Sequence, residues 1–346
     1  MAFTNDELSR SRHFRRELAQ TFRSGALMMA LVLVIALPAF VVSSTEFAPA
    51  TPFIVTGAVP VFIAALFGLR LAWDTLGVTV LFVACAELVN PWPWGVAALM
   101  AAAGLGLGIC ARNGWTAVAV QACIWCSLTL IAPPLELPGI DWVSGRLGQV
   151  LVPVWMVLMG GLWAVAVSAL LNSRLPKLSA KPLNKSSAAR YGGALAVLLG
   201  SAAFVASTWL TEVTGGWLLL TILVIVRPGL ADTWGRVVSR SVGTVLGGAA
   251  AALAGSVFVN QPLLLDTLAA VALIVAVVLL VRKANYAVYA FALTIAVVLM
   301  NMDGSDVLTA DIQRVGFTLA GAMLVAILAA SYEFITSRGS LRRVSS

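Results

Sequence analysis

Long apolar stretches alternate with short polar segments along almost the whole chain. A helix needs about 20 mainly apolar residues to cross the ~30 Å hydrocarbon core of a bilayer. The eighth stretch is short and ends at Arg227 and Pro228. The pattern predicts about twelve spans, at roughly residues 25–44, 50–68, 71–89, 93–111, 115–133, 147–171, 190–210, 215–230, 235–258, 263–281, 284–302 and 311–335.

The composition agrees with this pattern. Apolar residues make up 60% of the 346-residue chain and charged residues only 11%, and the mean hydropathy is +0.97. A soluble domain cannot bury that much apolar surface. The expected fold class is therefore an all-α polytopic membrane protein, with the lipid bilayer as its surroundings.

The positive charges indicate the orientation of the spans. With twelve spans, the Lys and Arg residues fall on one side except Arg146 and Arg314, whereas Glu46, Glu136 and Asp303 fall on the other. Cytoplasmic loops carry the excess of Lys and Arg in membrane proteins. We therefore expect both termini in the cytoplasm. The isoelectric point near 9.7 then reflects the excess of Lys and Arg on the cytoplasmic side, and we expect no nucleic-acid binding.

The segments divide into two halves around a polar, basic linker. We assign residues 1–24 to a basic amphipathic lead, which either lies on the membrane surface or docks a partner. Residues 25–171 form a first six-helix unit, 172–189 the linker, 190–335 a second six-helix unit and 336–346 a cytoplasmic tail. Short motifs recur in the same order in both units: Arg70-Leu-Ala-Trp-Asp74 aligns with Arg236-Val-Val-Ser-Arg240. Units with an even number of crossings form parallel repeats, and binding sites in such proteins lie near the junction between repeats.

The ninth predicted span carries the most informative residues. Arg236, Arg240, Gly243 and Gly247 form one stripe on a helix, and the Gly-x-x-x-Gly spacing predicts close packing against another helix. A charge inside a span usually faces the protein interior and finds a partner. Two partners remain open: an ion pair between Asp74 and Arg240, or a bound anionic substrate held by both guanidinium groups.

Three further charged residues have expected roles. Asp74 is the candidate proton carrier, because burial raises the pKa of a carboxylate and a nearby Arg lowers it. Arg146 and Arg314 occupy matching positions at the outer ends of the sixth and twelfth spans. They form either a second anion relay or neutralise neighbours such as Asp311.

Several chemistries are excluded. His13 is the chain's one histidine, and the Cys123-x-x-Cys126 pair has no second pair nearby, so we expect no metal site. The glycines at 104–108 lack the following Lys-Ser or Lys-Thr of a phosphate loop and are typical of helix packing. We therefore expect no cofactor and no enzymatic activity, and transport that uses an ion gradient or runs downhill.

The second half resembles a known family. Trp217, Thr221, Arg227-Pro228, Thr233, Arg236, Arg240, Gly243-Thr244 and Gly247 are similar to the signature of the fusaric acid resistance family, which includes bacterial aromatic acid exporters and has plant aluminium-activated malate channels as distant relatives. The resemblance implies a proton-driven exporter of aromatic or other organic carboxylates in the bacterial inner membrane, working with a periplasmic membrane fusion (adaptor) protein. It also implies that positions matching Arg236 and Arg240 line an anion path. We assign substrate binding to Arg236, Arg240, Arg227, Trp217, Thr221 and Thr244.

Two features depart from this family. The larger exporters carry a soluble domain between their membrane halves, where this chain has only the linker. The first half has Asp74 in place of the second arginine and lacks the Gly-Thr pair. These departures leave the exact substrate, and any regulation through a soluble domain, undetermined. Separately, a passive organic-anion channel and a non-transporting membrane subunit of an envelope complex are alternatives to an exporter, and the two units act either alone or as a homo-oligomer.

Overall fold

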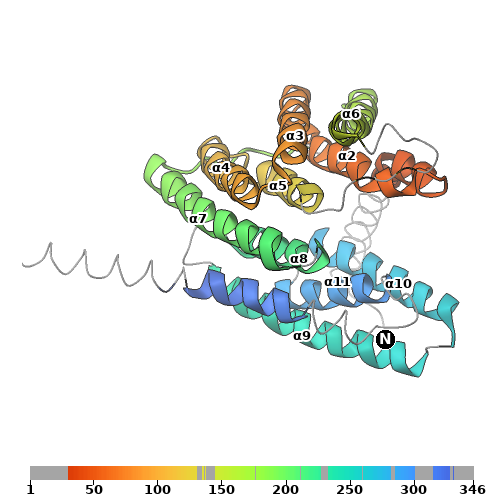
Figure 1. The fold of residues 1–346 in the computed structure, drawn as a ribbon. Coiled ribbons are helices and arrows are strands. Elements are labelled where there is room, and N and C mark those ends of the chain that lie inside the picture. Colours follow the sequence, from red (N-terminus) through yellow and green to blue (C-terminus); the bar gives the residue numbers. More distant parts are fainter. Residues whose placement is uncertain are drawn as a thin grey trace, which may run out of the picture.

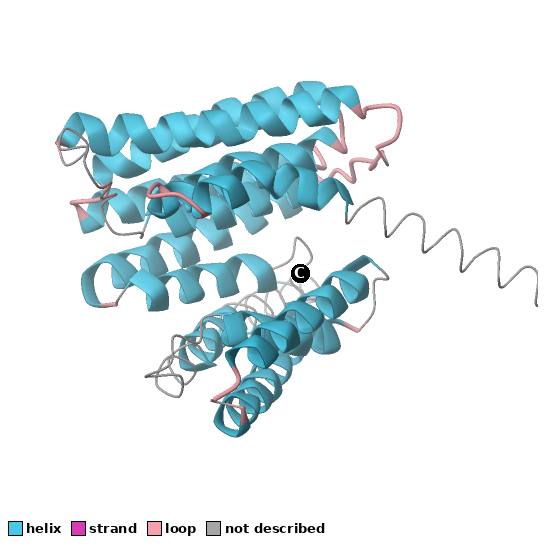
Figure 2. Cartoon of the chain, turned by 90° about the vertical axis from the view of Figure 1, so that its right-hand side faces the viewer, coloured by secondary structure: helices cyan, strands magenta, loops and turns pink. Residues whose placement is uncertain are grey.

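The structure is a computed structural model that describes residues 30–130, 135, 137, 145–175, 177–210, 212–226, 233–258, 260–281, 285–300, 315–327 and 330. The lead at 1–24, the tail at 336–346, Arg227 and Arg314 lie outside the described residues. Within the described ranges the chain consists of helices and the loops that join them, without strands (Figure 2). The elements are a helix at Ala30–Ser43, η1 (Ala48–Ala50), α2 (Thr51–Ala65), α3 (Leu69–Val89), α4 (Pro93–Arg112), α5 (Thr116–Leu130), α6 (Arg146–Leu170), α7 (Lys185–Trp209), α8 (Glu212–Ile225), α9 (Thr233–Val257), α10 (Pro262–Val281), α11 (Tyr286–Met300) and a helix at Val315–Ile327.

Six of these helices are long and apolar enough to cross a membrane: η1 with α2, α3, α4, α6, α7 and α9. Shorter apolar helices lie at Ala30–Ser43 and Val315–Ile327 and within α5, α8, α10 and α11. These helices confirm the class of helical membrane protein. The number of crossings and the duplication stay predictions.

The two halves meet along α4 and α7. The backbones of these helices are in contact, because a Cβ on Gly108 would lie 2.7 Å from the Cα of Gly192. The helices run antiparallel, because Gly104, one turn before Gly108, meets Ala196, one turn after Gly192. Figure 1 shows α7 and α8 between the helices of the first half and α9 to α11. Side chains of α4, α5, α7, α8 and the 315–327 helix form one apolar core there.

Each half packs its second helix against its sixth. In the first half, α2 meets α6 at Gly57 and Gly160. In the second half, α8 meets the 315–327 helix at Gly321, where an added Cβ would lie 3.0 Å from the Cβ of Thr221. A duplicated unit would produce this shared pairing.

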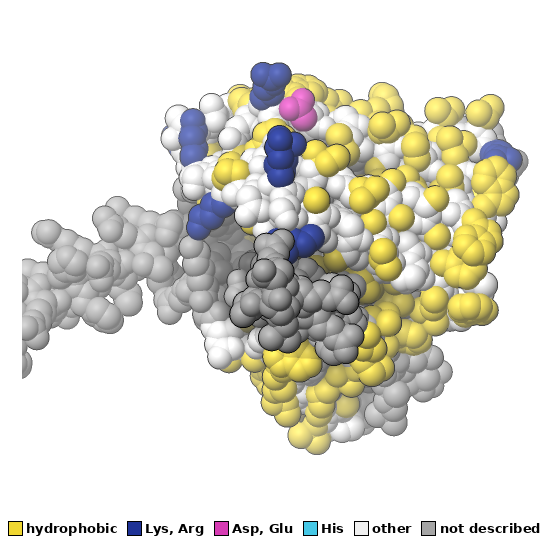
Figure 3. Space-filling model, turned by 90° about the vertical axis from the view of Figure 1, so that its left-hand side faces the viewer, with side chains coloured by type: hydrophobic (Ala, Val, Ile, Leu, Met, Phe, Trp, Pro, Cys, Tyr) yellow, Lys and Arg dark blue, Asp and Glu magenta, His cyan; other side chains and the backbone are white. Residues whose placement is uncertain are grey.

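One end of the molecule carries most of the described positive charge. The segment after α6 lies over the ends of α2 and α4, where the N–H of Leu178 donates to Leu66 O and the N–H of Leu183 to Ala111 O. We call this the cationic end and define it by Arg70, Arg112, Arg174, Lys177, Lys181, Lys185 and Arg190. Figure 3 faces the end where α7 begins and shows Lys and Arg side chains gathered there. At the opposite end Trp94 packs on Phe204, with ring centroids 4.3 Å apart.

Candidate anion-binding site

The site is built on α9, which glycines hold close to α11. A Cβ on Gly243 would lie 2.6 Å from the carbonyl oxygen of Ala287, and one on Gly247 would lie 2.7 Å from that of Phe291. Real Cβ atoms do not approach other atoms so closely. The two helices therefore run side by side with backbones in contact, which places the amino-terminal turns of α11 next to the arginines of α9.

The guanidinium group of Arg236 contacts two neighbouring helices. Its Nη1 donates a hydrogen bond of 3.2 Å to the carbonyl oxygen of Val224, near the end of α8. Its guanidinium carbon lies 4.3 Å from the centroid of the Tyr286 ring, at the start of α11, which is within the range of a cation–π interaction. Arg236 thus ties α8, α9 and α11 together in this arrangement.

Arg240, one turn further along α9, is buried without such partners. Only 2% of its surface is exposed, and its Nε–H has no hydrogen-bond partner. No carboxylate in the described part of the chain forms an ion pair with it. The hydroxyl of Tyr289 lies within range of an electrostatic interaction with the guanidinium group. A buried charge without a partner costs several kcal/mol, so this position favours the arrival of an anion.

A second unsatisfied group lies one turn beyond. Thr244 is 1% exposed, and its Oγ1 also has no hydrogen-bond partner in the described part of the protein. Residues four apart lie on the same face of a helix, so Arg240 and Thr244 present donors to one side of α9. A guanidinium group and a hydroxyl can together bind the two oxygens of a carboxylate.

Two tyrosines of α11 complete the surroundings. The rings of Tyr286 and Tyr289 lie 5.7 Å apart and are tilted by 35°. The sequence analysis did not assign them to the site. The available signal was their spacing of three residues at the beginning of a predicted span next to the glycine stripe.

The residues of α8 have less direct roles. Thr221 is buried, but its Oγ1 donates a 2.7 Å hydrogen bond to the carbonyl oxygen of Trp217 within the same helix. Its Cβ faces Gly321 in the 315–327 helix. The structure thus places Thr221 at a helix contact, with its hydroxyl already used. Trp217 lies one turn earlier on α8 and is half-buried.

The remaining predicted residues lie apart from Arg240. Asp74 is exposed on α3, and the alternative of an ion pair between Asp74 and Arg240 is absent from the described residues. Arg146 is exposed at the start of α6, with its guanidinium carbon 5.7 Å from the centroid of the Trp92 ring. Where the structure describes the chain, no three His, Cys, Asp or Glu side chains gather in a way that could hold a metal ion.

Comparison with known proteins supports the resemblance. Residues 197–329 match the family model described as fusaric acid resistance protein-like, a segment that includes α8 to α11 and every candidate residue of α9. No curated protein and no solved structure matches the chain. The match and the apolar helices together indicate a multi-pass membrane protein of a transport or resistance type.

Proposed function

Starting from the fusaric acid resistance protein-like domain in the second half, we propose that the chain exports aromatic or other organic carboxylates across the bacterial inner membrane. The observation that carries this proposal is Arg240, which is buried and whose Nε–H has no hydrogen-bond partner in the described structure. In low-dielectric surroundings a guanidinium group binds a carboxylate strongly, and its planar donors suit two oxygens at once. Thr244 adds a donor one turn away.

The two arginines have different roles in this proposal. Arg240 receives the carboxylate, because its Nε–H has no hydrogen-bond partner and no carboxylate in the described structure pairs with it. Arg236 would have to leave the carbonyl of Val224 and the ring of Tyr286 before it could join. Its contacts hold the end of α8 and the beginnings of α9 and α11 together while the site is empty.

The proposal includes coupling and partners. Export against a gradient requires an energy source, and exchange with protons is the mechanism that the family resemblance supports, with Asp74 as the proton carrier. A periplasmic adaptor protein would carry the released acid onward.

Transport by the purified full chain in proteoliposomes tests this function. Radiolabelled phthalate and malate serve as ring-bearing and aliphatic probes, with a proton gradient imposed or absent. We expect proton-dependent flux in the wild type, loss of flux in Arg240→Gln, and no change in Arg174→Gln, which alters an exposed arginine in the segment after α6. Equal flux in both variants would remove Arg240 from the transport path.

The same experiment separates the alternatives. Flux that depends on Arg240 but not on the proton gradient would identify a passive anion channel. No flux of either acid, from protein that is folded and correctly inserted, would favour a non-transporting membrane subunit.

A further inference from the structure

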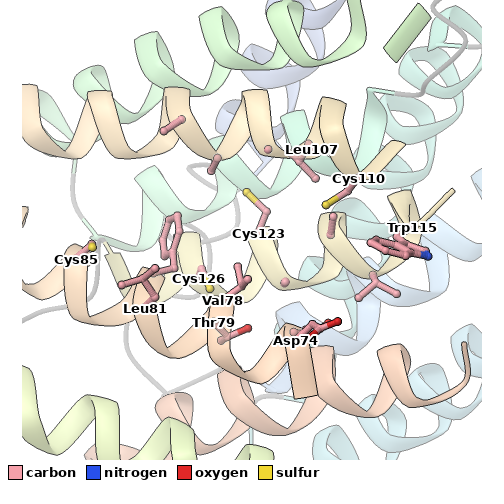
Figure 4. A pocket seen from close by; sticks show the side chains of 18 of the residues that line it. Asp74, Val78, Thr79, Leu81, Cys85, Leu107, Cys110, Trp115, Cys123 and Cys126 are labelled. Carbon is pink, nitrogen blue, oxygen red and sulfur yellow. The ribbon is translucent and has the colours of Figure 1, made fainter. Parts of the chain in front are cut away.

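A second feature lies in the first half, away from Arg240. A cavity of about 510 Å³ lies between α3, α4 and α5, and Figure 4 shows the side chains around it. Its walls are almost entirely apolar, with residues such as Val78, Phe82 and Leu107, and Asp74 is the one carboxylate among the residues that line it. A carboxylate would repel an anionic substrate, so this cavity is unsuited to the acid that Arg240 would bind.

The length of the cavity corresponds to one leaflet of a bilayer. Figure 4 shows Asp74 and Trp115 at one end and Cys85 toward the other. Asp74 and Cys85 are separated by three turns of α3, or ~16 Å at 1.5 Å per residue. The hydrocarbon core of a bilayer is ~30 Å thick. The cavity is therefore about as long as one leaflet of the hydrocarbon core is thick.

The cavity opens sideways along the surface of α3 and α4. Val78 and Leu81 line it, and each is 65% exposed. Ala102 of α4 lines it as well and is also exposed. In a membrane-spanning protein, exposed apolar side chains at this depth face lipid, so a lipid chain can enter without crossing the protein.

The headgroup end carries charges of both signs. Asp74 has Arg70 one turn before it on α3, and Arg112 is the last residue of α4, two residues after the cavity residue Cys110. All three charged side chains are exposed. Trp115 lines the cavity at this level, where tryptophan is enriched at membrane surfaces. These residues lie toward the same end of the cavity, and their charges complement a headgroup with both a phosphate and an ammonium group.

We propose that the cavity binds one acyl chain of a phospholipid with an ethanolamine headgroup, in the leaflet at the cationic end. The ammonium group lies on Asp74, and the phosphate lies between Arg70 and Arg112. The chain fills the space between α3 and α4. This site shares no residue with the anion site on α9, but it shares Asp74 with the proposed proton path. The lipid site is therefore tested by lipid retention, which does not depend on transport.

Native mass spectrometry of the full chain, released from bilayers with equal phosphatidylethanolamine and phosphatidylglycerol, tests the proposal. A Cβ on Gly106 meets no atom within 4 Å, and Gly106 lines the cavity, so Gly106→Phe fills the cavity without a backbone clash. Gly77→Phe is the matched control, because Gly77 has equally open surroundings on α3 but does not line the cavity. We expect the wild type and Gly77→Phe to retain the ethanolamine lipid, and Gly106→Phe to lose it.

The headgroup assignment has its own variant. Exposed ion pairs contribute up to about 1 kcal/mol, so the wild type should prefer ethanolamine over glycerol lipid by about two- to fivefold. Asp74→Asn should still retain lipid but without that preference. Equal lipid retention by Gly106→Phe and Gly77→Phe, or a wild-type lipid ratio equal to that of the bilayer, would overturn the proposal.

A second measurement uses wild-type protein alone. Cys85 and Cys110 line the cavity as free, half-buried thiols, and their labelling by a membrane-permeant maleimide reports on occupancy. Phosphatidylethanolamine added to delipidated protein should slow the labelling, whereas phosphatidylglycerol should slow it less. An unchanged labelling rate with both lipids would contradict the proposal.

Discussion

Replacing Arg240 by methionine should make the empty protein more stable. Arg240 is enclosed and its Nε–H is unpaired, so its charge is costly in the absence of an anion. Replacing even a buried ion pair by apolar side chains of similar volume often stabilises a protein by about 1–4 kcal/mol, and at Arg240 no ion pair is lost within the described structure. A change of 1 kcal/mol shifts the unfolding midpoint of a domain of 150–250 residues by about 2–4 °C, and larger chains shift less. We expect Tm to rise by about 2 °C or more in Arg240→Met.

The same substitution at Arg236 should have the opposite effect. Arg236→Met removes the hydrogen bond to Val224 O and the contact with the Tyr286 ring. A hydrogen bond from a charged donor contributes about 1.5–3 kcal/mol, and an exposed cation–π contact contributes about 0.5–1 kcal/mol. Because Arg236 is partly exposed, water weakens both interactions and the loss on substitution is smaller than their sum. Tm should therefore fall by a few degrees.

Thermal unfolding of both variants in the same detergent, without added acid, measures this contrast. The two substitutions are identical in chemistry and lie one turn apart on α9, so general effects of removing an arginine cancel. A decrease in Tm for Arg240→Met as large as that for Arg236→Met would show that Arg240 has a stabilising partner in the empty protein. That result would refute the reasoning that assigns the anion site.

Three other predictions concern helix contacts, the anion site and coupling. Gly243→Ala should destabilise the protein by about 1–3 kcal/mol, because its Cβ would lie 2.6 Å from Ala287 O. Gly106→Ala should be neutral or stabilise the protein by up to about 1 kcal/mol. Thermal unfolding compares the two variants, and an equal loss of stability in both would contradict the close packing of α9 on α11. Thr244→Val should weaken carboxylate binding about 3- to 10-fold, as measured by titration calorimetry, and an unchanged affinity would exclude its hydroxyl from the site. Asp74→Asn should abolish concentrative export in proteoliposomes while leaving acid binding intact, and proton-driven accumulation by this variant would rule out Asp74 as the proton carrier.

The sequence predicted the helical membrane class because hydrophobicity along the chain determines it directly. The stripe on α9 was also accessible, since helical periodicity places Arg236, Arg240 and the two glycines on one face. The family resemblance of the second half is confirmed over residues 197–329.

The different environments of the two arginines could not be predicted from the sequence. Arg236 donates a hydrogen bond to a carbonyl of α8 and lies over the Tyr286 ring of α11, whereas the Nε–H of Arg240 has no hydrogen-bond partner in the described structure. That difference depends on how three helices pack. The alignment of Asp74 with Arg240 likewise indicated a shared origin of the two halves, but it carried no information on the distance between these two side chains.

Glycine spacing was similarly ambiguous in α4. Gly104 and Gly108 meet the backbone of α7, but Gly106 faces open space in the cavity beside α3. The sequence pattern is the same at all three positions. Only the position of neighbouring helices decides which glycine is a contact and which is part of a cavity wall.

The most direct test of the account is whether Arg240 holds a carboxylate. Phthalate binding to the purified full chain should be measured by titration calorimetry for wild type, Arg240→Gln and the control Arg174→Gln. Removing one partner of a buried charge pair costs about 2 kcal/mol or more, so Arg240→Gln should weaken binding at least about 30-fold, while Arg174→Gln binds like the wild type. Equal affinity in all three proteins would contradict the account.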